Sequence, residues 1–407
     1  MFSYALRSIA LLLCAASAQA LTLDEALTAA QNYAPDLVAS RSGAAAAQSL
    51  TLSAGALPDP KLSFAIDNLP LEGEDQYRIG KSMRSIGLMQ EFPNAGKRAA
   101  ERQIATAAWQ VSSAQHRYAQ LNVQRATTLA WLSLYYAQEK IQVLDTQVIE
   151  NQNSLSLSRA AIAGGSTVDN VLVAQLETQQ LADARDDLNS ESQQARALLA
   201  RWIGPDRAAE PISGSLPVWQ REPTSNDQSD QFSKQPDLHA ASSQISAARA
   251  ELALMEAGKH PDWGLELALQ RSDMGQNQAM VKVSFDLPFF TTSRQDPKIA
   301  AATANLQRAE AEKTTRSAGY RQQYAELNAQ GDALTSQLQR LKQQTLPLIQ
   351  KQTELALAGL QSGKGNSNAV LEVRKTKRVA QLRALDLASR LAAIQAQIFF
   401  LTGGHSS

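Results

Sequence analysis

The feature that most constrains this fold is a run of residues, 97–161, that contains neither glycine nor proline. At about 1.5 Å per residue, a helix over this run would be roughly 95 Å long. Globular helices average only about 10–14 residues. The low aromatic content of 5% also favours long helices packed on one another over a single compact globule.

The chain repeats one plan after about 200 residues. The matching pairs, at shifts of 201 or 199 residues, are Pro35 and Pro236, Pro60 and Pro261, Gly164 and Gly363, and Gly204 and Gly403. Ordered matches at a near-constant shift indicate a tandem duplication. Each half is predicted to run helix, strand, strand, very long helix, glycine turn, helix.

This plan predicts four segments and the elements within them. The segments are a signal peptide at 1–20, a first repeat at 21–204, a linker at 205–234 and a second repeat at 235–407. The strands are expected at 61–67, 82–92, 264–271 and 279–287, and the long helical hairpins at 97–203 and 292–402. A further helix is predicted from Leu21, and Pro347 should kink or break the second long helix.

Residues 1–20 have the pattern of a secretory signal. Arg7 supplies the positive charge, residues 9–16 the apolar core, and residues 18–20 a small-x-small site, so cleavage is expected after Ala20. The only cysteine, Cys14, lies inside this leader and follows Leu13, whereas lipidation requires a small residue there. We therefore expect a mature chain without disulfides.

The predicted strands alternate apolar and polar residues, most clearly over 264–288. Both a half-buried soluble sheet and a transmembrane β-barrel give this pattern. Outside the leader we expect no run long and apolar enough for a membrane helix, which leaves a barrel as the route across a membrane. Four strands are too few to close a barrel, so spanning strands would have to be shared between subunits. The strand pattern alone does not give the number of subunits.

Several motifs resemble those of the TolC family of outer-membrane efflux channels, and the likeness covers the whole mature chain. They are an opening helix at 21–37, strand-to-helix junctions at 90–98 and 283–288, and helix-tip turns at 164–172 and 363–371. The resemblance implies a mainly α fold with a membrane β-barrel portion. It also implies a homotrimer that joins a 12-stranded β-barrel to a long α-helical periplasmic barrel.

The same resemblance implies a passive exit duct in the outer membrane of a Gram-negative bacterium, in contact with outer-membrane lipid. It docks with a periplasmic adaptor (membrane fusion) protein and an inner-membrane efflux pump of the resistance-nodulation-division type. Residues 58–60 and 92–98 are most similar to the heavy-metal branch, which favours metal cations as cargo. The alternatives are a drug or small-molecule channel of the same architecture, and a soluble periplasmic coiled-coil rod or adaptor.

The resemblance also indicates candidate functional residues at the two glycine turns. These turns are either simple hairpin loops or the mouth that meets the adaptor. Their members are Gly164, Gly165, Ser166, Thr167, Gly363, Lys364, Gly365 and Asn366.

Further candidates lie on the strands and near one turn. Glu372 is either a tunnel-constriction acid or a solvated glutamate, and Ala369 and Asn170 stand where the family often has another acid. Lys282, Ser284 and Asp286 share one strand face, which is lumenal in a barrel and solvent-facing in a soluble sheet. Trp263 is either a packing residue or an interfacial anchor.

Charge and motif content exclude several function classes. The numbers of basic and acidic residues are equal, which gives no reason to expect nucleic-acid binding. The sequence has no Ser/His/Asp set, no phosphate loop and no clustered metal ligands. We therefore expect no catalytic residue, no cofactor and no resident metal.

Overall fold

The computed structural model describes residues 20–162, 168–217, 219, 232, 234–362 and 367–404. These residues divide into two compact units, each assembled from both halves of the sequence. We call residues 1–35, 120–224 and 323–407 the helical unit, and residues 36–119 and 225–322 the sheet unit.

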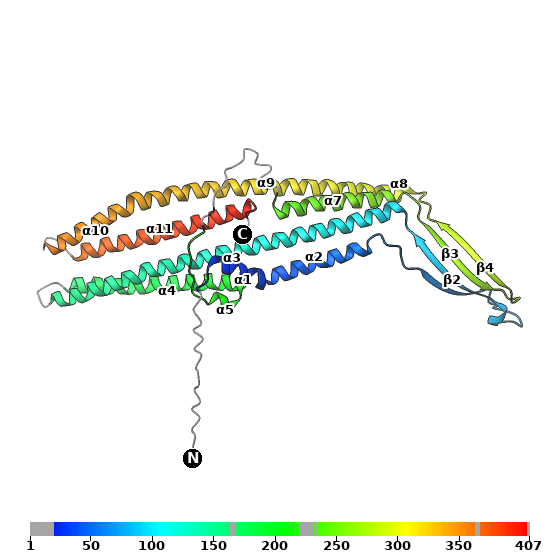
Figure 1. Ribbon diagram of the computed structural model, residues 1–407, viewed down its shortest axis with the longest axis horizontal. Helices are drawn as coiled ribbons and strands as arrows, with labels where there is room; N and C mark the ends of the chain where they lie inside the picture. Colours follow the sequence, from blue (N-terminus) through cyan, green and yellow to red (C-terminus); the bar gives the residue numbers. More distant parts are fainter. Residues whose placement is uncertain are drawn as a thin grey trace, which may run out of the picture. The chain divides into compact units, whose positions relative to one another are not determined.

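The chain is mainly helical (Figure 1). The helices before residue 210 are α1 (Leu23–Tyr33), α2 (Pro35–Ser53), α3 (Ala95–Ile162), α4 (Asp169–Ile203) and α5 (Pro205–Ala208). Those after it are α7 (Pro236–Ala257), α8 (Thr291–Arg294), α9 (Asp296–Arg340), α10 (Leu346–Gln361) and α11 (Ser367–Leu401). The described residues also form a 3₁₀ turn, η1 (Ile79–Lys81), and a π-helical segment, η2 (Leu341–Thr345).

The sheet unit contains one antiparallel sheet with the strand order β1-β2-β3-β4. The strands are β1 (Lys61–Asp67), β2 (Met83–Phe92), β3 (Trp263–Arg271) and β4 (Asn277–Phe285). Each begins and ends within two residues of its predicted position. The central pair, β2 and β3, joins the two halves of the sequence, and β1 and β4 are the edges.

The first predicted helix begins two residues later than expected. Leu21 is 1% exposed, and its N–H donates to the carbonyl of Pro211 at 2.7 Å in a parallel bridge to Ile212. The indole N–H of Trp131 donates to the Leu21 carbonyl at 3.2 Å. Leu21 therefore pairs as a strand, and Thr22 caps α1 through a capping box with Glu25.

In the helical unit, α4 runs antiparallel along α3. Lys140 contacts Glu191 at 2.8 Å, Asp145 contacts Arg185 at 3.1 Å, and the Asn151 amide donates to the Ala174 carbonyl at 3.0 Å. The α3 partner number rises as the α4 partner number falls, as a hairpin requires. In the same unit, α11 folds back along α10 (Figure 1).

The interruption expected near Pro347 is a π segment rather than an end of helical structure. Residues Leu341–Thr345 form η2, and Pro347 lies in the first turn of α10. Proline has no N–H for the α-helical ladder, and π turns commonly absorb such a defect inside a helix.

The expectation that no segment after the leader is long and apolar enough for a membrane helix is wrong for α11, by length and composition. The helix Asn368–Leu401 contains an 18-residue window with a mean hydropathy of 1.3. The same helix buries Leu387, Ala396 and Phe400 in the helical unit. Core helices of soluble proteins pass the same test, because a buried stripe also needs a high apolar content.

Candidate functional site

The strand register places most of the large apolar side chains of the sheet on one face, which we call the apolar face. For example, Leu62, Leu88, Leu267 and Val281 are direct neighbours across the four strands. Successive side chains of a strand point to opposite faces, so each row recurs two residues on. The other members are Phe64, Ile66, Ile86, Phe92, Trp263, Leu265, Leu269, Ala279, Val283 and Phe285.

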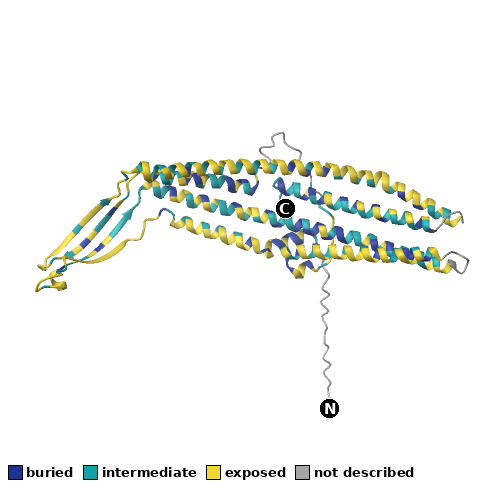
Figure 2. Ribbon diagram, turned by 180° about the vertical axis from the view of Figure 1, so that it is seen from behind, coloured by how far each residue is buried: buried dark blue, intermediate teal, exposed yellow. Residues whose placement is uncertain are grey.

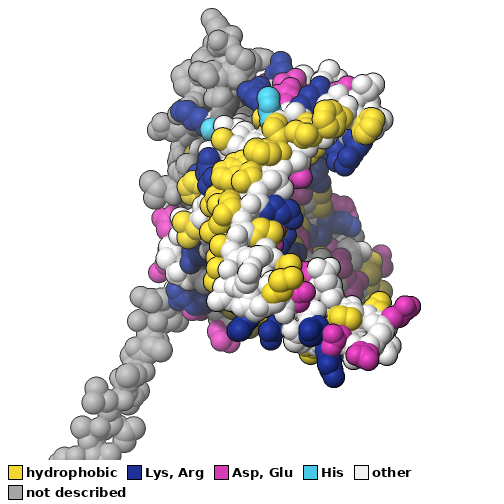
Figure 3. Space-filling model, turned by 90° about the vertical axis from the view of Figure 1, so that its right-hand side faces the viewer, with side chains coloured by type: hydrophobic (Ala, Val, Ile, Leu, Met, Phe, Trp, Pro, Cys, Tyr) yellow, Lys and Arg dark blue, Asp and Glu magenta, His cyan; other side chains and the backbone are white. Residues whose placement is uncertain are grey.

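The apolar face is open rather than packed on the unit's own core. Phe64 is 74% exposed, Val281 68% and Leu269 66%. Figure 2 shows the strands mostly in the exposed colour, and Figure 3 shows hydrophobic side chains gathered in a band. Contiguous apolar patches of this kind mark a protein–protein or membrane contact surface.

The opposite face of the sheet, which we call the polar face, holds charges and small residues. Lys61 contacts Glu91 at 2.5 Å, and Lys282 contacts Glu266 at 3.3 Å. Two of the three predicted strand residues, Lys282 and Ser284, lie on this face. The third, Asp286, directly follows the end of β4 and is exposed. Its backbone N–H donates to the Asp262 carbonyl at 2.9 Å.

An aromatic row marks the end of the apolar face next to the helices of the sheet unit. Phe92 and Trp263 stack at 4.1 Å between ring centroids, and Phe285 is the cross-strand neighbour of Trp263. Trp263 is 41% exposed. The Trp263 side chain therefore packs against Phe92 on one side and is accessible from outside on the other, as in an interfacial aromatic belt.

A polar joint connects β2 and α3 to the turn before β3. The Asp262 carboxylate accepts from the Asn94 backbone N–H at 2.8 Å and from the Lys97 ammonium group. Burial raises the pKa of Asp262, but the hydrogen bonds from Lys97 and Asn94 outweigh it, so the pKa lies below its ordinary value. Next to this joint, Arg98 donates to the Gly55 carbonyl at 2.9 Å and so fixes the end of α2.

Sequence reasoning singled out residues 90–98 but assigned no role to Asn94, Lys97 or Asp262. Lys97 and Asp262 are 165 positions apart, in different halves of the chain. The available signal was Lys97 in one junction and an aspartate directly after the duplicated Pro261 in the other. No periodicity connects two such positions.

The eight predicted turn residues, Gly164 to Thr167 and Gly363 to Asn366, lie outside the described residues. Glu372 is described and exposed on α11. Close to it, Arg374 donates to the Ser154 hydroxyl at 2.7 Å, and Arg378 pairs with Glu177. These contacts connect α11 to α3 and α4, so the two hairpins are joined by polar bonds within the helical unit.

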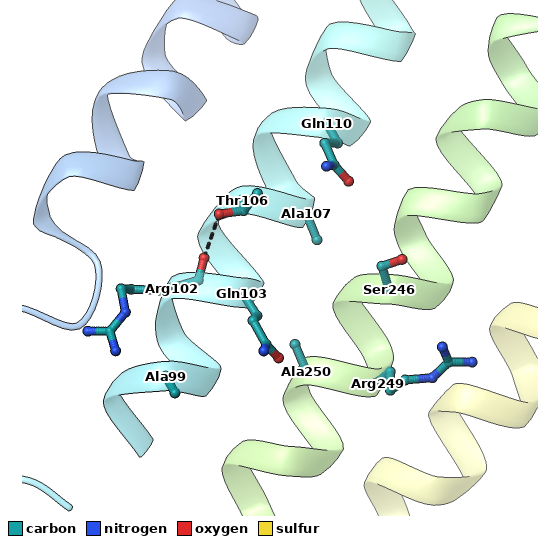
Figure 4. A pocket seen from close by; sticks show the side chains of 9 residues that line it. All are labelled: Ala99, Arg102, Gln103, Thr106, Ala107, Gln110, Ser246, Arg249 and Ala250. Carbon is teal, nitrogen blue, oxygen red and sulfur yellow. Dashed lines mark hydrogen bonds between the residues drawn. The ribbon is translucent and has the colours of Figure 1, made fainter. Parts of the chain in front are cut away.

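A pocket of about 520 Å³ lies between α3 and α7 in the sheet unit (Figure 4). It is lined by Ala99, Arg102, Gln103, Thr106, Ala107, Gln110, Ser246, Arg249 and Ala250. No acid, histidine or cysteine is among them. In the part of the chain that the structure describes, no three His, Cys, Asp or Glu residues gather as metal ligands. The pocket therefore offers no acid–base or metal chemistry.

Comparison with known proteins gives matches to outer-membrane efflux proteins. Residues 229–404 match the family model for outer membrane efflux proteins. The match covers less than half of the chain, so it is the second half that is similar to this family. The proteins of this family and the structural neighbours are passive outer-membrane efflux channels, not enzymes.

The chain is similar to known proteins along nearly its whole length. It is 22% identical over 373 residues to the cobalt-zinc-cadmium resistance protein CzcC of Cupriavidus metallidurans, covering 90% of this chain and 86% of that protein. Its fold is similar to that of the outer membrane protein VceC of Vibrio cholerae, with a TM-score of 0.79, 19% identity, and coverage of 94% and 96% of the two chains. It is equally similar to CusC, with a TM-score of 0.79, 16% identity, and coverage of 94% and 92%.

Proposed function

We propose that the chain is one third of a homotrimeric outer-membrane duct that receives heavy-metal cations from an inner-membrane pump through a periplasmic adaptor. The observation that carries this proposal is the exposed apolar face on an open four-stranded sheet. In water such a face is unfavourable, whereas in a bilayer it is the lipid-facing side. Three copies of four strands give the twelve strands that the family resemblance implies.

The polar face then lines the lumen. Lys282 and Ser284 lie on it, and Asp286 continues the same register. A charged side chain on a barrel's lipid face costs about 2–4 kcal/mol near the midplane, so the paired charges of this sheet belong on the water side. Phe92, Trp263 and Phe285 form the interfacial belt on the periplasmic side.

The two hairpin tips meet the adaptor in this proposal. Gly164 to Thr167 and Gly363 to Asn366 form the docking mouth, and Glu372 lines its constriction. Carboxylates in a ring favour cations, which suits a duct for metal ions. The similarity to a cobalt-zinc-cadmium resistance protein supports metal over drug export.

We also propose that the leader is removed after Ala20. This cut makes Leu21 the first residue of the mature chain, with its main chain held at Pro211 and Ile212. The mass of the mature protein tests the site. A mass that corresponds to a start at Leu21 supports it, and a start at any other residue contradicts it.

The decisive experiment is fractionation of cells that make the full-length chain. We expect the protein in the outer-membrane fraction, resistant to a urea wash and released only by detergent. On an unheated gel it should migrate at about three times the mass of the mature chain, which is the 44.0 kDa chain without its leader, and collapse to the monomer on boiling. A monomer or dimer obtained from the periplasm without detergent would overturn the duct and favour a soluble coiled-coil rod.

A further inference from the structure

Two arginines stand side by side on the apolar face of the sheet. Arg84 of β2 and Arg271 of β3 are direct cross-strand partners, and both are exposed. Their row continues to Ile66 on β1 and Asn277 on β4. They belong to the two central strands, away from the edges where another copy of the chain would join.

Like charges directly opposite each other on two strands destabilise a sheet. Within the described residues, neither guanidinium has a carboxylate within 4.0 Å. By contrast, two basic residues of the 68–82 loop have a carboxylate partner: Arg78 and Lys81 contact Asp75 at 2.8 and 3.9 Å. The arginine pair is therefore the unneutralised positive charge of this end of the sheet.

The pair lies between the apolar face and the connecting loops. The next row toward the helices of the sheet unit is Phe64, Ile86, Leu269 and Ala279, and further apolar rows follow it. On the other side lie the 68–82 loop and the β3–β4 turn. A ligand that satisfies both features carries negative charge at one end and acyl chains that extend over the apolar rows.

We propose that Arg84 and Arg271 bind a phosphomonoester of an acylated, phosphorylated glycolipid in the outer leaflet of the outer membrane. A phosphomonoester carries about −1.5 to −2 charges at pH 7, which matches two guanidinium groups. Arginine also presents its donors in a fork that fits phosphate oxygens. A phosphodiester lipid carries one charge only and matches the pair less well. This inference rests on the proposed function, because it needs the sheet to span the membrane.

The test uses the detergent-purified full chain and two probes, bisphosphorylated lipid A and the same lipid with its phosphates removed. Binding is measured by native mass spectrometry and as the shift in melting temperature. We expect removal of the phosphates to weaken binding at least tenfold. The variant carrying both Arg84→Gln and Arg271→Gln should lose the same factor for intact lipid A and bind the dephosphorylated lipid like wild type.

Two controls make the result specific. Lys282→Gln removes a positive charge from the polar face of the same sheet and should leave lipid A binding unchanged. A variant with Arg84→Lys and Arg271→Lys keeps the charge but not the fork, so it should bind between wild type and the glutamine variant. If the glutamine variant fails to fold, the binding of the two lipids to the wild-type protein still tests the role of the phosphates.

Equal affinity of wild type for both lipids overturns the inference, as does undiminished lipid A binding by a folded glutamine variant. A stronger response to phosphatidylglycerol than to lipid A would also overturn it. Fractionation separates this failure from failure of the proposed function. A protein that sits in the outer membrane without this preference refutes the lipid site alone, whereas a protein absent from membranes refutes the duct itself.

Discussion

At the scale of single residues, the ion pair of Arg378 on α11 and Glu177 on α4 makes a sharp prediction. The two side chains are only 10% and 16% exposed. Removing one partner leaves the other charge mostly buried and unpaired, which destabilises strongly. We expect Arg378→Met to lower the free energy of unfolding by about 3 kcal/mol. Denaturant unfolding in detergent measures it, and a double-mutant cycle with Glu177→Gln isolates the pairwise part.

The matched control is Arg383 with Asp386 on the same helix. These side chains are 51% and 30% exposed at a distance of 3.0 Å, so Arg383→Met should cost less than about 1 kcal/mol. Equal losses for the two arginine variants would show that burial does not set the strength of the Arg378 pair.

A second prediction at this scale concerns pH and the polar joint. The folded-state pKa of Asp262 lies below its ordinary value of 3.8, because the hydrogen bonds from Lys97 and Asn94 outweigh burial. A lowered carboxyl pKa contributes stability that is complete above the unfolded-state pKa and is lost as pH falls through the folded-state pKa. Asp262→Asn should therefore be less stable than wild type at pH 7, by roughly 1–3 kcal/mol, as for hydrogen bonds to charged groups.

The difference in stability between Asp262→Asn and wild type should become smaller as pH falls below about 4. Melting temperatures of both proteins between pH 7 and pH 2.5 measure it. Asp59→Asn, at an exposed position of the same unit, is the matched control for the substitution itself. If the melting temperatures of Asp262→Asn and wild type differ by the same amount down to pH 2.5, the polar joint has no electrostatic role.

At the scale of helices, two glycines should respond in opposite directions to alanine. Gly204 ends α4 at φ +87°, where a Cβ would lie 3.2 Å from the Tyr33 ring. Gly319 is exposed inside α9 with nothing within 4 Å of the added Cβ. We expect Gly204→Ala to destabilise by about 1–2 kcal/mol and Gly319→Ala to stabilise by about 0.5–1 kcal/mol. Calorimetric melting tests both, and matching signs would be inconsistent with this reading.

At the scale of the sheet, the two faces should differ in their tolerance of charge. Val281→Lys puts an ammonium group on the apolar face, and Gln278→Lys puts one on the polar face of the same strand. In a bilayer the first should cost about 2–4 kcal/mol and the second close to nothing. The yield of heat-sensitive trimer in outer membranes measures the difference. Equal yields would show that the apolar face does not meet lipid.

At the scale of the whole molecule, the prediction concerns cargo. A strain without this chain should become more sensitive to zinc, cobalt and cadmium than to hydrophobic drugs, and a plasmid copy should restore resistance. In the proposed assembly the pump supplies the energy for export, so resistance should also vanish when the pump gene is deleted. A strain that becomes sensitive only to drugs would support the duct and contradict the metal cargo.

Much of the fold follows from local pattern. The period-two alternation placed all four strands within two residues, and the glycine-free run predicted α3 because helix propensity and spacing are properties of neighbouring residues. The prediction was wrong where distant contacts override local preference. Leu21 leaves the first helix because its main chain pairs with Ile212, almost two hundred residues away.

The duplicated plan, the long helices and the two-faced strands can all be predicted from the chain alone, since each depends on the spacing of residues along it. Which residues from the two halves meet follows from the three-dimensional fold. It brought Arg84 beside Arg271, Lys97 to Asp262, and Glu177 to Arg378. These contacts depend on strand register and helix packing, and a one-residue shift of register would place a different pair together.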